Sequence, residues 1–553
     1  MTDTLAIALA QLNPTVGDLE GNKALILRAR AEAAAQGADL VVCTELVVTG
    51  YPPEDLVLKP MFQEQSRAVV EALAAATADG GPALLIGAPW VDEGKLYNAA
   101  LLLDGGEVAA RRYKYELPNY GVFDEVRVFA RAGLPGPIPF RGVRLGAMIC
   151  EDMWFPEVAE CLVESGAEIV IVINGSPFES DKEDVRLNCA VARIGETELP
   201  LVYTNQVGGQ DELVFDGASF VLNADHSLAA QAPAFEESVA LTRWTREADG
   251  WHCAPGSRAA LPDGHAATYR AMTLGLADYV GKNGFPGVLI GLSGGIDSAL
   301  TAAVAVDALG ADRVFCVVMP SRYTAQSSLD DAAECARLLG VRHEAVGIEP
   351  AVDALGGMLA PIFAGRNADE TEENIQARVR GVILMAISNK LGHMVLTTGN
   401  KSEMSVGYAT LYGDMCGGYS VLKDVYKTDV FEMSRWRNRN WMEGLKGPQG
   451  PVIPEAIIDK PPSAELRPDQ TDQDTLPPYE VLDDVLRGLV EEERSTEELV
   501  ARGHAAETAA RIWRMLDIAE YKRRQAPPGI KLTLRSFGKD RRYPITNRYR
   551  GAD

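Results

Sequence analysis

VLIGLSGGIDS, residues 288–298, runs from an apolar strand through a glycine-rich turn into the helical stretch ALTAAVAVDAL. At the start of a helix, unpaired backbone N–H groups and the positive end of the helix dipole attract phosphate oxygens. Gly294 and Gly295 carry no Cβ, so the backbone can approach such a ligand closely. No lysine follows the glycines, which excludes the GxxxxGK[ST] pattern of a Walker A loop. The stretch therefore predicts an anion site, with the carboxylate of Asp297 available to Mg²⁺.

The pattern SGGxDS resembles the PP-loop of the ATP pyrophosphatases, which split ATP into AMP and diphosphate and adenylate a substrate. A plain glycine turn is the alternative interpretation, and the match of the whole loop between a strand and a helix disfavours it. The resemblance implies that ATP is bound by the residues of this loop, namely Gly291, Leu292, Ser293, Gly294, Gly295, Ile296, Asp297 and Ser298.

Length and composition set the class of protein. A chain of 553 residues is too long for one core, so two or more domains are expected. The net charge of −25 argues against a nucleic-acid or anionic-membrane partner, because those surfaces need Lys and Arg. The chain shows neither a signal peptide nor an apolar run of bilayer length. Eight scattered cysteines without a CxxC pair indicate no disulfide framework or zinc site. We therefore expect a cytoplasmic protein.

One segment departs from this acidic composition. Between Lys522 and Arg550 there are ten Lys or Arg residues and one acid, Asp540, so the segment carries about +9. Such a run is either a solvated surface or a contact for an anionic substrate.

The pattern of apolar runs divides the chain into two α/β halves. Residues 1–245 are predicted to form the first domain, residues 246–268 a linker rich in Gly and Pro, and residues 269–553 the second domain. The long loop 445–478 has the composition of a lid or binding loop. Strands are expected at 5–12, 38–46, 83–90, 97–104, 144–150, 168–175, 199–208 and 218–225, with helices at 22–37 and 64–79, and in the second half strands at 287–292, 314–320, 342–348 and 393–399.

A candidate nucleophile lies in the first half. Cys150 follows the strand RLGAMI directly and precedes polar residues, which is where active sites gather in α/β folds. Taken alone, a cysteine of this kind is more often a small buried hydrophobic residue. Glu45, at the end of VVCTE, and Lys114, before YELPNY, supply the carboxylate and the amine that thiol chemistry would need.

The frames TEL, KYELPNYGVFDE and ICEDMWFPE resemble the nitrilase superfamily, and more narrowly the glutaminase domain of glutamine-dependent NAD⁺ synthetases. The resemblance implies a nitrilase-like α-β-β-α sandwich followed by a Rossmann-like domain with a parallel sheet. It also implies a catalytic triad of Cys150, Glu45 and Lys114. Glutamine would be bound by Tyr120, Ser176 and Lys182.

The implied chemistry is coherent. A thiolate attacks the amide, and a glutamate takes the thiol proton and later activates water against the thioester. A cationic Lys114 is expected to lower the pKa of the thiol and to stabilise the oxyanion.

Three stretches of the second half extend the resemblance: TEENIQAR at 371–378, TGNKSE at 398–403 and KPPSA at 460–464. By this resemblance Arg378 and Thr398 would bind ATP, whereas Asn374, Glu403 and Lys522 would contact deamido-NAD⁺. Asp297 and Glu403 would hold Mg²⁺ together with phosphate oxygens.

The implied reaction is the ATP-dependent amidation of deamido-NAD⁺ to NAD⁺ through an adenylate, with ammonia from L-glutamine and with AMP, diphosphate and glutamate as products. Free ammonia would serve as an alternative nitrogen donor. ATP is a co-substrate and Mg²⁺ the cofactor, and related synthetases are homo-oligomers, commonly octamers.

Three rival functions are less consistent with the sequence. Other glutamine-dependent PP-loop ligases, such as GMP or asparagine synthetase, need a Cys-His-Glu triad or an N-terminal cysteine, and here residue 2 is Thr2. A tRNA-modifying enzyme fused to an amidase conflicts with the acidic charge. A catalytically inactive scaffold would have no need for the triad together with an intact SGGIDS loop.

Overall fold

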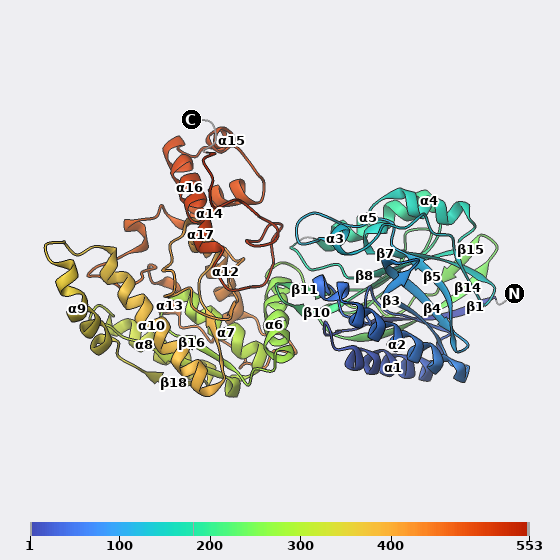
Figure 1. Cartoon of the computed structure of the whole chain (residues 1–553), viewed down its shortest axis with the longest axis horizontal. Helices are drawn as coiled ribbons and strands as arrows, with labels where there is room; N and C mark the ends of the chain where they lie inside the picture. Colours follow the sequence, from blue (N-terminus) through green and yellow to red (C-terminus); the bar gives the residue numbers. More distant parts are fainter. Residues whose placement is uncertain (1–2, 181, 550–553) are drawn as a thin grey trace. The chain divides into compact units, whose positions relative to one another are not determined.

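The computed structural model describes residues 3–180 and 182–549. The chain divides into two compact units, Met1–Ala267 and Thr268–Asp553, and each is described by itself (Figure 1). The predicted linker, 246–268, is shorter than expected. Its first part completes a β-hairpin and its last residues begin helix α6 (Gly264–Lys282).

Unit 1 contains two large sheets. The first has the strand order β15 (Gly250–Cys253), β14 (Ser238–Glu247), β1 (Thr4–Gln11), β2 (Leu40–Val42), β3 (Ala83–Asp92), β4 (Lys95–Asp104) and β5 (Glu107–Tyr113). The second has the order β13 (Leu228–Gln231), β12 (Phe220–Leu222), β9 (Leu201–Asn205), β8 (Ile169–Asn174), β7 (Val143–Ile149) and β6 (Ile138–Phe140). A separate hairpin joins β10 (Val207–Gln210) to β11 (Leu213–Asp216).

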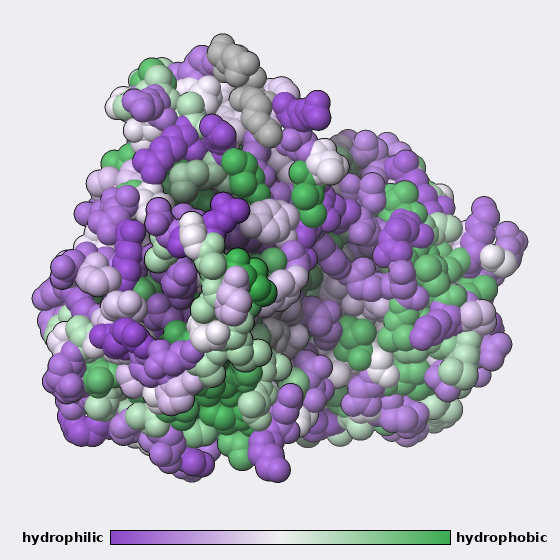
Figure 2. All heavy atoms as spheres, turned by 60° about the vertical axis from the view of Figure 1, so that its left-hand side comes forward, coloured by the Kyte–Doolittle hydropathy of each residue, from purple (hydrophilic) through white to green (hydrophobic). Residues whose placement is uncertain are grey.

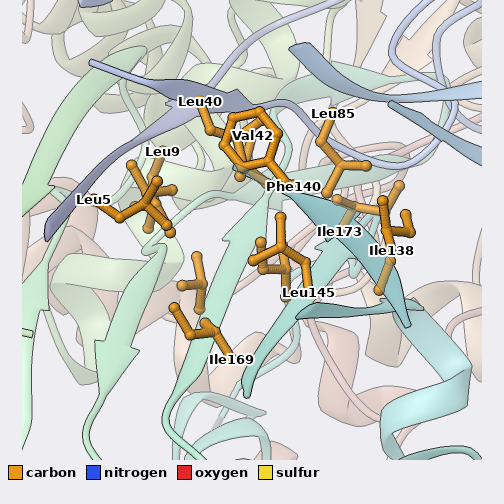
Figure 3. Close-up of a cluster of buried hydrophobic side chains, with 14 of the residues drawn as sticks. Leu5, Leu9, Leu40, Val42, Leu85, Ile138, Phe140, Leu145, Ile169 and Ile173 are labelled. Atoms are coloured by element: carbon orange, nitrogen blue, oxygen red, sulfur yellow. The ribbon is translucent and has the colours of Figure 1, made fainter. Parts of the chain in front are cut away.

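The two sheets pack face to face around one apolar core. Side chains alternate along β1, so that Leu5, Ile7 and Leu9 enter this core while Ala8 faces the opposite side. In Figure 3, Leu5, Leu40 and Leu85 from the first sheet lie opposite Phe140, Leu145 and Ile169 from the second. The outer faces are covered by helices α1 (Leu19–Ala35) and α2 (Pro60–Ala76) on one side, and by α4 (Pro156–Glu164) and α5 (Lys182–Thr197) on the other. The predicted α-β-β-α sandwich is confirmed.

Unit 2 is built on a five-stranded parallel sheet, as predicted. Its order is β18 (Arg342–Ala345), β17 (Val314–Val318), β16 (Val288–Gly291), β19 (Met394–Thr397) and β20 (Tyr419–Ser420). Along the chain this order is third, second, first, fourth and fifth, so the direction of winding reverses between β16 and β19. In open α/β sheets, ligands bind at the carboxyl ends of the strands at such a reversal. The loop 292–295 follows β16 and lies at this point.

Helices surround the sheet of unit 2. They are α7 (Ile296–Leu309), α8 (Gln326–Leu339), α9 (Glu349–Phe363), α10 (Glu370–Leu391), α11 (Lys401–Val406), α12 (Lys427–Arg439) and α13 (Glu455–Asp459). A second apolar cluster joins α11, and Tyr426 just before α12, to α14 (Tyr479–Val490), α15 (Thr496–Ala501) and α16 (Ala506–Ile518). The short helix α17 (Glu520–Arg523) ends just before the final segment. The predicted loop 445–478 contains α13 and a 3₁₀ turn, Asp472–Asp474.

Hydrophilic residues are spread over the face visible in Figure 2, with hydrophobic residues in patches between them. No helix among the described residues is long and apolar enough to cross a bilayer. All eight cysteines are free.

Candidate active sites

The first site forms where three strands of unit 1 end. Cys150 follows β7 directly, Glu45 lies just beyond β2, and Lys114 follows β5. Cys150 has a φ of +46°, a left-handed conformation that non-glycine residues rarely adopt. Such backbone strain gathers at active sites, where the surrounding structure imposes it. The structure therefore brings the predicted triad to one buried place.

The carboxylate and the amine of this triad are in direct contact. Lys114 Nζ donates to Glu45 Oε1 at 2.7 Å, and both residues are almost completely buried. The other oxygen of Glu45 accepts the backbone N–H of Gly175 at 3.0 Å. Asn98 Nδ2 donates to Glu45 Oε1 at 2.7 Å. These bonds fix the orientation of the Glu45 carboxylate, and none of the three involves the thiol of Cys150.

A fourth residue, Glu125, was missed by the sequence reasoning. It begins the four-residue helix α3 (Glu125–Val128) and accepts Lys114 Nζ on both oxygens at 2.9 Å. The hydroxyl of Tyr51 donates to Glu125 Oε1 at 2.9 Å. Burial raises the pKa of Glu125 to about 7, with Lys114 opposing and Glu45 adding to the rise. The only signal in the sequence was the acidic pair in FDE, 123–125, which is typical of any exposed turn.

Lys114 lowers the pKa of the Cys150 thiol, as expected, but other groups outweigh it. Burial, followed by the Glu45 charge, raises the pKa of Cys150 well above its usual value. The two carboxylates that pair with Lys114, Glu45 and Glu125, both act against the effect of the lysine. Burial lowers the pKa of Lys114, but Glu125 and Glu45 together raise it by more than burial lowers it. The pKa of Lys114 therefore lies above its usual value and the amine stays charged. The resting site therefore holds a neutral thiol beside a glutamate that can accept its proton.

The three predicted glutamine-binding residues lie around this site in different settings. Tyr120 is 57% exposed, and its hydroxyl donates to both oxygens of Glu151 at 3.0 and 3.1 Å. Ser176 is buried in the loop after β8. Lys182 begins α5 and pairs with Glu179 at 3.5 Å. Glu151, next to the nucleophile, is a further carboxylate that the sequence reasoning did not assign, and burial raises its pKa.

A buried arginine, Arg186, holds the Ser176 loop in place. Its Nε donates to Ser176 Oγ at 3.1 Å and its Nη2 to the carbonyls of Ser176 and Pro177, each at 2.8 Å. Its Nη1 forms an ion pair with both oxygens of Asp216 at 2.8 and 2.7 Å. Because Gly175 in the same loop donates to Glu45, Arg186 indirectly fixes the base as well as Ser176.

The second site is a cavity of about 280 Å³ in unit 2, called here the loop cavity. All eight residues of the predicted ATP loop, from Gly291 to Ser298, line it. Gly294 has a φ of +79°, and a Cβ there would meet the carbonyl oxygen of Ser328 at 2.2 Å. Helix α7 starts at Ile296 without a side-chain cap, so its first N–H groups are available to an anion. These features suit the binding of phosphate.

The two predicted metal ligands meet at this cavity through a lysine. Lys427 Nζ contacts Asp297 Oδ2 and lies 3.2 Å from Glu403 Oε1. Asn400 connects the same pair, because its amide donates to Asp297 Oδ1 at 2.8 Å and its oxygen accepts the Glu403 N–H at 2.9 Å. Burial raises the pKa of Glu403 to about 8, with Lys427 opposing and Asp297 adding to the rise.

The other predicted contacts divide into two groups. Thr398 and Glu403 line the loop cavity, whereas Arg378, Asn374 and Lys522 do not. These three instead surround the segment 407–411: Arg378 Nε donates to the Leu411 carbonyl at 3.2 Å and Asn374 accepts from Thr410 Oγ1 at 2.8 Å. Lys522 Nζ donates to the carbonyls of Gly407 and Ala409 at 2.7 and 2.6 Å.

Five of the ten basic residues of this segment form ion pairs. Arg523, Arg524 and Arg541 pair with Glu520. Lys531 pairs with Asp540, and Arg535 with Glu493. At these five residues the positive charge of the segment is therefore balanced by acids, of which Glu520 and Asp540 have buried side chains and Glu493 is exposed. Arg550 lies outside the described residues.

The donor atoms of the loop cavity fit Mg²⁺. The described residues contain no cluster of three or more His, Cys, Asp and Glu that would hold a metal by themselves. Protein sites for Mg²⁺, however, usually supply one or two carboxylates and take the remaining oxygens from substrate phosphates and water. Asp297 and Glu403 face a cavity that suits phosphate and provide those two carboxylates.

The comparisons with known proteins match both units. A carbon-nitrogen hydrolase family model matches residues 6–248, and an NAD synthase model matches residues 268–526. A glutamine-dependent NAD(+) synthetase of Rhodobacter capsulatus is 54% identical over 100% of both chains. One from Xanthomonas campestris is 48% identical over 99% of this chain and 98% of its own. The solved structure of the Acinetobacter baumannii enzyme with ADP is 40% identical, with a TM-score of 0.79 over 100% of both chains.

Proposed function

The chain belongs to the family of glutamine-dependent NAD(+) synthetases, and from that premise we propose which of its residues carry each half of the reaction. Unit 1 is the carbon-nitrogen hydrolase half, which releases ammonia from glutamine. Unit 2 is the NAD synthase half, which uses ATP and that ammonia to convert deamido-NAD⁺ into NAD⁺.

In unit 1, Cys150 attacks the side-chain amide carbon of glutamine. Because the resting thiol is neutral, Glu45 takes its proton as the carbon–sulfur bond forms and passes a proton to the departing ammonia. Glu45 then activates a water that hydrolyses the thioester to glutamate. The ammonium of Lys114, held by Glu45 and Glu125, stabilises the oxyanion in both steps. Tyr120, Ser176 and Lys182 bind the rest of glutamine, and the Glu151 carboxylate suits its α-ammonium group.

In unit 2, the loop cavity holds ATP. The nicotinate carboxylate of deamido-NAD⁺ attacks the α-phosphorus, which forms an adenylate and releases diphosphate. Ammonia then attacks the acyl carbon, and AMP departs. The N–H groups at the start of α7 bind the phosphate oxygens, and Lys427 adds a positive charge beside them. Asn374 and Lys522 are the proposed dinucleotide contacts. Arg378 lies with them at the segment 407–411 and not in the loop cavity, so we move it from ATP to the dinucleotide.

Asp297 and Glu403 would hold Mg²⁺ together with phosphate oxygens. The ion would neutralise charge on the diphosphate that leaves. Lys427 contacts both carboxylates, so its positive charge offsets the repulsion between them when no cation is bound.

We also propose a cytoplasmic location and a homo-oligomeric state. A nucleophilic thiol has to stay reduced, and all eight cysteines of the chain are free. Leu355, Met358 and Ile362 on α9 are large apolar residues that are exposed in the single chain. Size-exclusion chromatography with light scattering measures the oligomeric state.

The observation that carries the proposed function is that one chain holds both a Cys150–Glu45–Lys114 site and a loop cavity suited to phosphate. We expect purified protein given ATP, Mg²⁺ and deamido-NAD⁺ to form NAD⁺ with either glutamine or ammonium salt. Each NAD⁺ should appear with one AMP and one diphosphate, as coupled assays and chromatography would show. Formation of ADP, or NAD⁺ synthesis without ATP, would contradict the adenylate route.

Arg186→Lys should slow glutamine hydrolysis while leaving the ammonium-driven reaction unchanged. A lysine keeps the charge, but its single nitrogen cannot reach Ser176, Pro177 and both oxygens of Asp216 together. We expect kcat/KM for glutamine to fall about tenfold, because both the Ser176 loop and Glu45 lose their fixed position. Steady-state hydrolysis measures the effect.

Arg30→Lys is the matched control. Arg30 is also buried, and it forms a bidentate ion pair with Asp79 and a hydrogen bond to the Pro82 carbonyl. It lies on α1, and neither of these partners belongs to the thiol site. If the two variants lose glutamine hydrolysis equally, or only in proportion to lost thermal stability, Arg186 has no positioning role.

A further inference from the structure

The charged side chains that line the loop cavity differ in whether they already form ion pairs. Among the described residues the lining contains five acids, Asp297, Glu403, Asp414, Glu465 and Asp472, and three cations, Arg380, Lys427 and Lys460. Acids therefore outnumber cations in a cavity that has to accept a highly anionic nucleotide. Which cations remain available to a phosphate decides where that anion is bound.

Two of the three cations already have carboxylate partners. Lys427 contacts Asp297 and Glu403. Lys460 contacts Ser328 Oγ and lies 3.6 Å from Glu465 and 3.9 Å from Asp331. Both amines thus already share their positive charge with neighbouring carboxylates.

Arg380 differs from both lysines. Its Nε donates to the carbonyl of Met319, which follows β17, at 3.1 Å. It forms no ion pair with any described residue, and its remaining guanidinium N–H groups bond to none of them. Glu465, Asp414 and Glu349 raise its pKa only from a distance, against a larger lowering by burial. The guanidinium of Arg380 is therefore held in place through Nε, while its other N–H groups are available. Such a planar set of donors is well suited to a phosphate group.

We infer that Arg380 binds a phosphate group of a nucleotide substrate in the loop cavity. This inference deepens the proposed function and rests on it. The phosphate belongs to ATP or to the dinucleotide, and separate binding measurements distinguish these two sources.

The neighbouring arginine, Arg378, is not equivalent. Successive residues of a helix are rotated by about 100°, so Arg378 and Arg380 point to nearly opposite sides of α10. Arg378 donates to the Leu411 carbonyl and does not line the cavity. The resemblance assigns ATP to Arg378, whereas the geometry assigns the cavity phosphate to Arg380.

The test compares Arg380→Gln with Lys390→Gln, which removes one positive charge from the exposed end of the same helix. Calorimetry measures ATP with Mg²⁺ and deamido-NAD⁺ separately, so that no reaction proceeds. We expect Arg380→Gln to weaken at least one nucleotide about tenfold to a hundredfold, as loss of a charge-assisted bond does. Lys390→Gln should stay within about twofold of the unchanged protein.

Two further variants make the result decisive. Arg380→Lys keeps the charge without the fork and should bind with intermediate affinity. Where Arg380→Gln weakens ATP binding, Arg378→Gln should weaken it less. The inference is overturned if Arg380→Gln, with normal thermal unfolding and normal glutamine hydrolysis, binds both nucleotides like the unchanged protein. If the unchanged protein itself binds neither nucleotide and forms no NAD⁺, the proposed function fails instead.

Discussion

Cys150→Ala should abolish NAD⁺ synthesis from glutamine and leave synthesis from ammonium salt within about twofold of the unchanged protein. Alanine removes the sulfur that forms the thioester. We expect the glutamine-driven rate to fall at least about a thousandfold, as for other enzymes that lose their nucleophile. The ammonium-driven reaction needs only residues of unit 2. Coupled assays with each nitrogen donor measure the two rates.

Cys161→Ala is the control for this change. Cys161 is a half-buried cysteine on α4 of the same unit, and its sulfur donates to the Pro135 carbonyl at 3.8 Å. This variant should use both nitrogen donors normally. Glutamine use that survives in Cys150→Ala would show that the triad is assigned to the wrong residues.

The fold could be predicted wherever apolar residues run without interruption. Every strand expected from such a run contains an observed strand, because the central strands of both units are covered on both faces. The missed strands are of another kind. β5 reads EVAARRY and exposes every second residue over most of its length, and β14 reads SVALTRWTRE and alternates between buried and exposed residues from Thr242 to Thr245. The end of β14 and the whole of β15 were therefore assigned to the linker.

The candidate sites could be predicted where a motif is continuous in sequence. Cys150, Glu45 and the SGGIDS loop each follow a strand whose position the apolar pattern reveals, whereas Lys114 follows the missed strand β5 and was identified only from the motif around it. Partners brought together by the fold could not be predicted in this way. Lys427 reaches Asp297 across 130 residues, and Glu125 reaches Lys114 from a helix of four residues. No local pattern marks either contact.

The pKa of Cys150 shows why charge arguments need the structure. From the sequence, one lysine beside one cysteine predicts a lowered pKa. In the folded chain the same lysine forms ion pairs with Glu45 and Glu125. Burial is the largest influence on the thiol, and it raises the pKa of Cys150. The number of carboxylates around an amine is a property of the fold.

Asp297→Asn should abolish NAD⁺ synthesis from both nitrogen donors while leaving glutamine hydrolysis intact. Asparagine preserves the shape of the side chain but removes the charge that balances Lys427 and that would bind Mg²⁺. The ammonium of Lys427 then shares only Glu403, so the phosphate site changes its charge at the point where diphosphate leaves. We expect a loss of at least about a hundredfold, the size seen when one electrostatic stabiliser of a transition state is removed.

The adenylation step can be isolated by the exchange of labelled diphosphate into ATP, which needs deamido-NAD⁺ but no nitrogen donor. Asp297→Asn should lose this exchange, whereas Asp312→Asn, an exposed acid on the short turn after α7, should retain it. Since Cys150→Ala should also retain the exchange, the two variants together separate the thiol step from the phosphate step. Normal exchange in Asp297→Asn would remove this carboxylate from the phosphate chemistry and, with it, the assignment of the Mg²⁺ site.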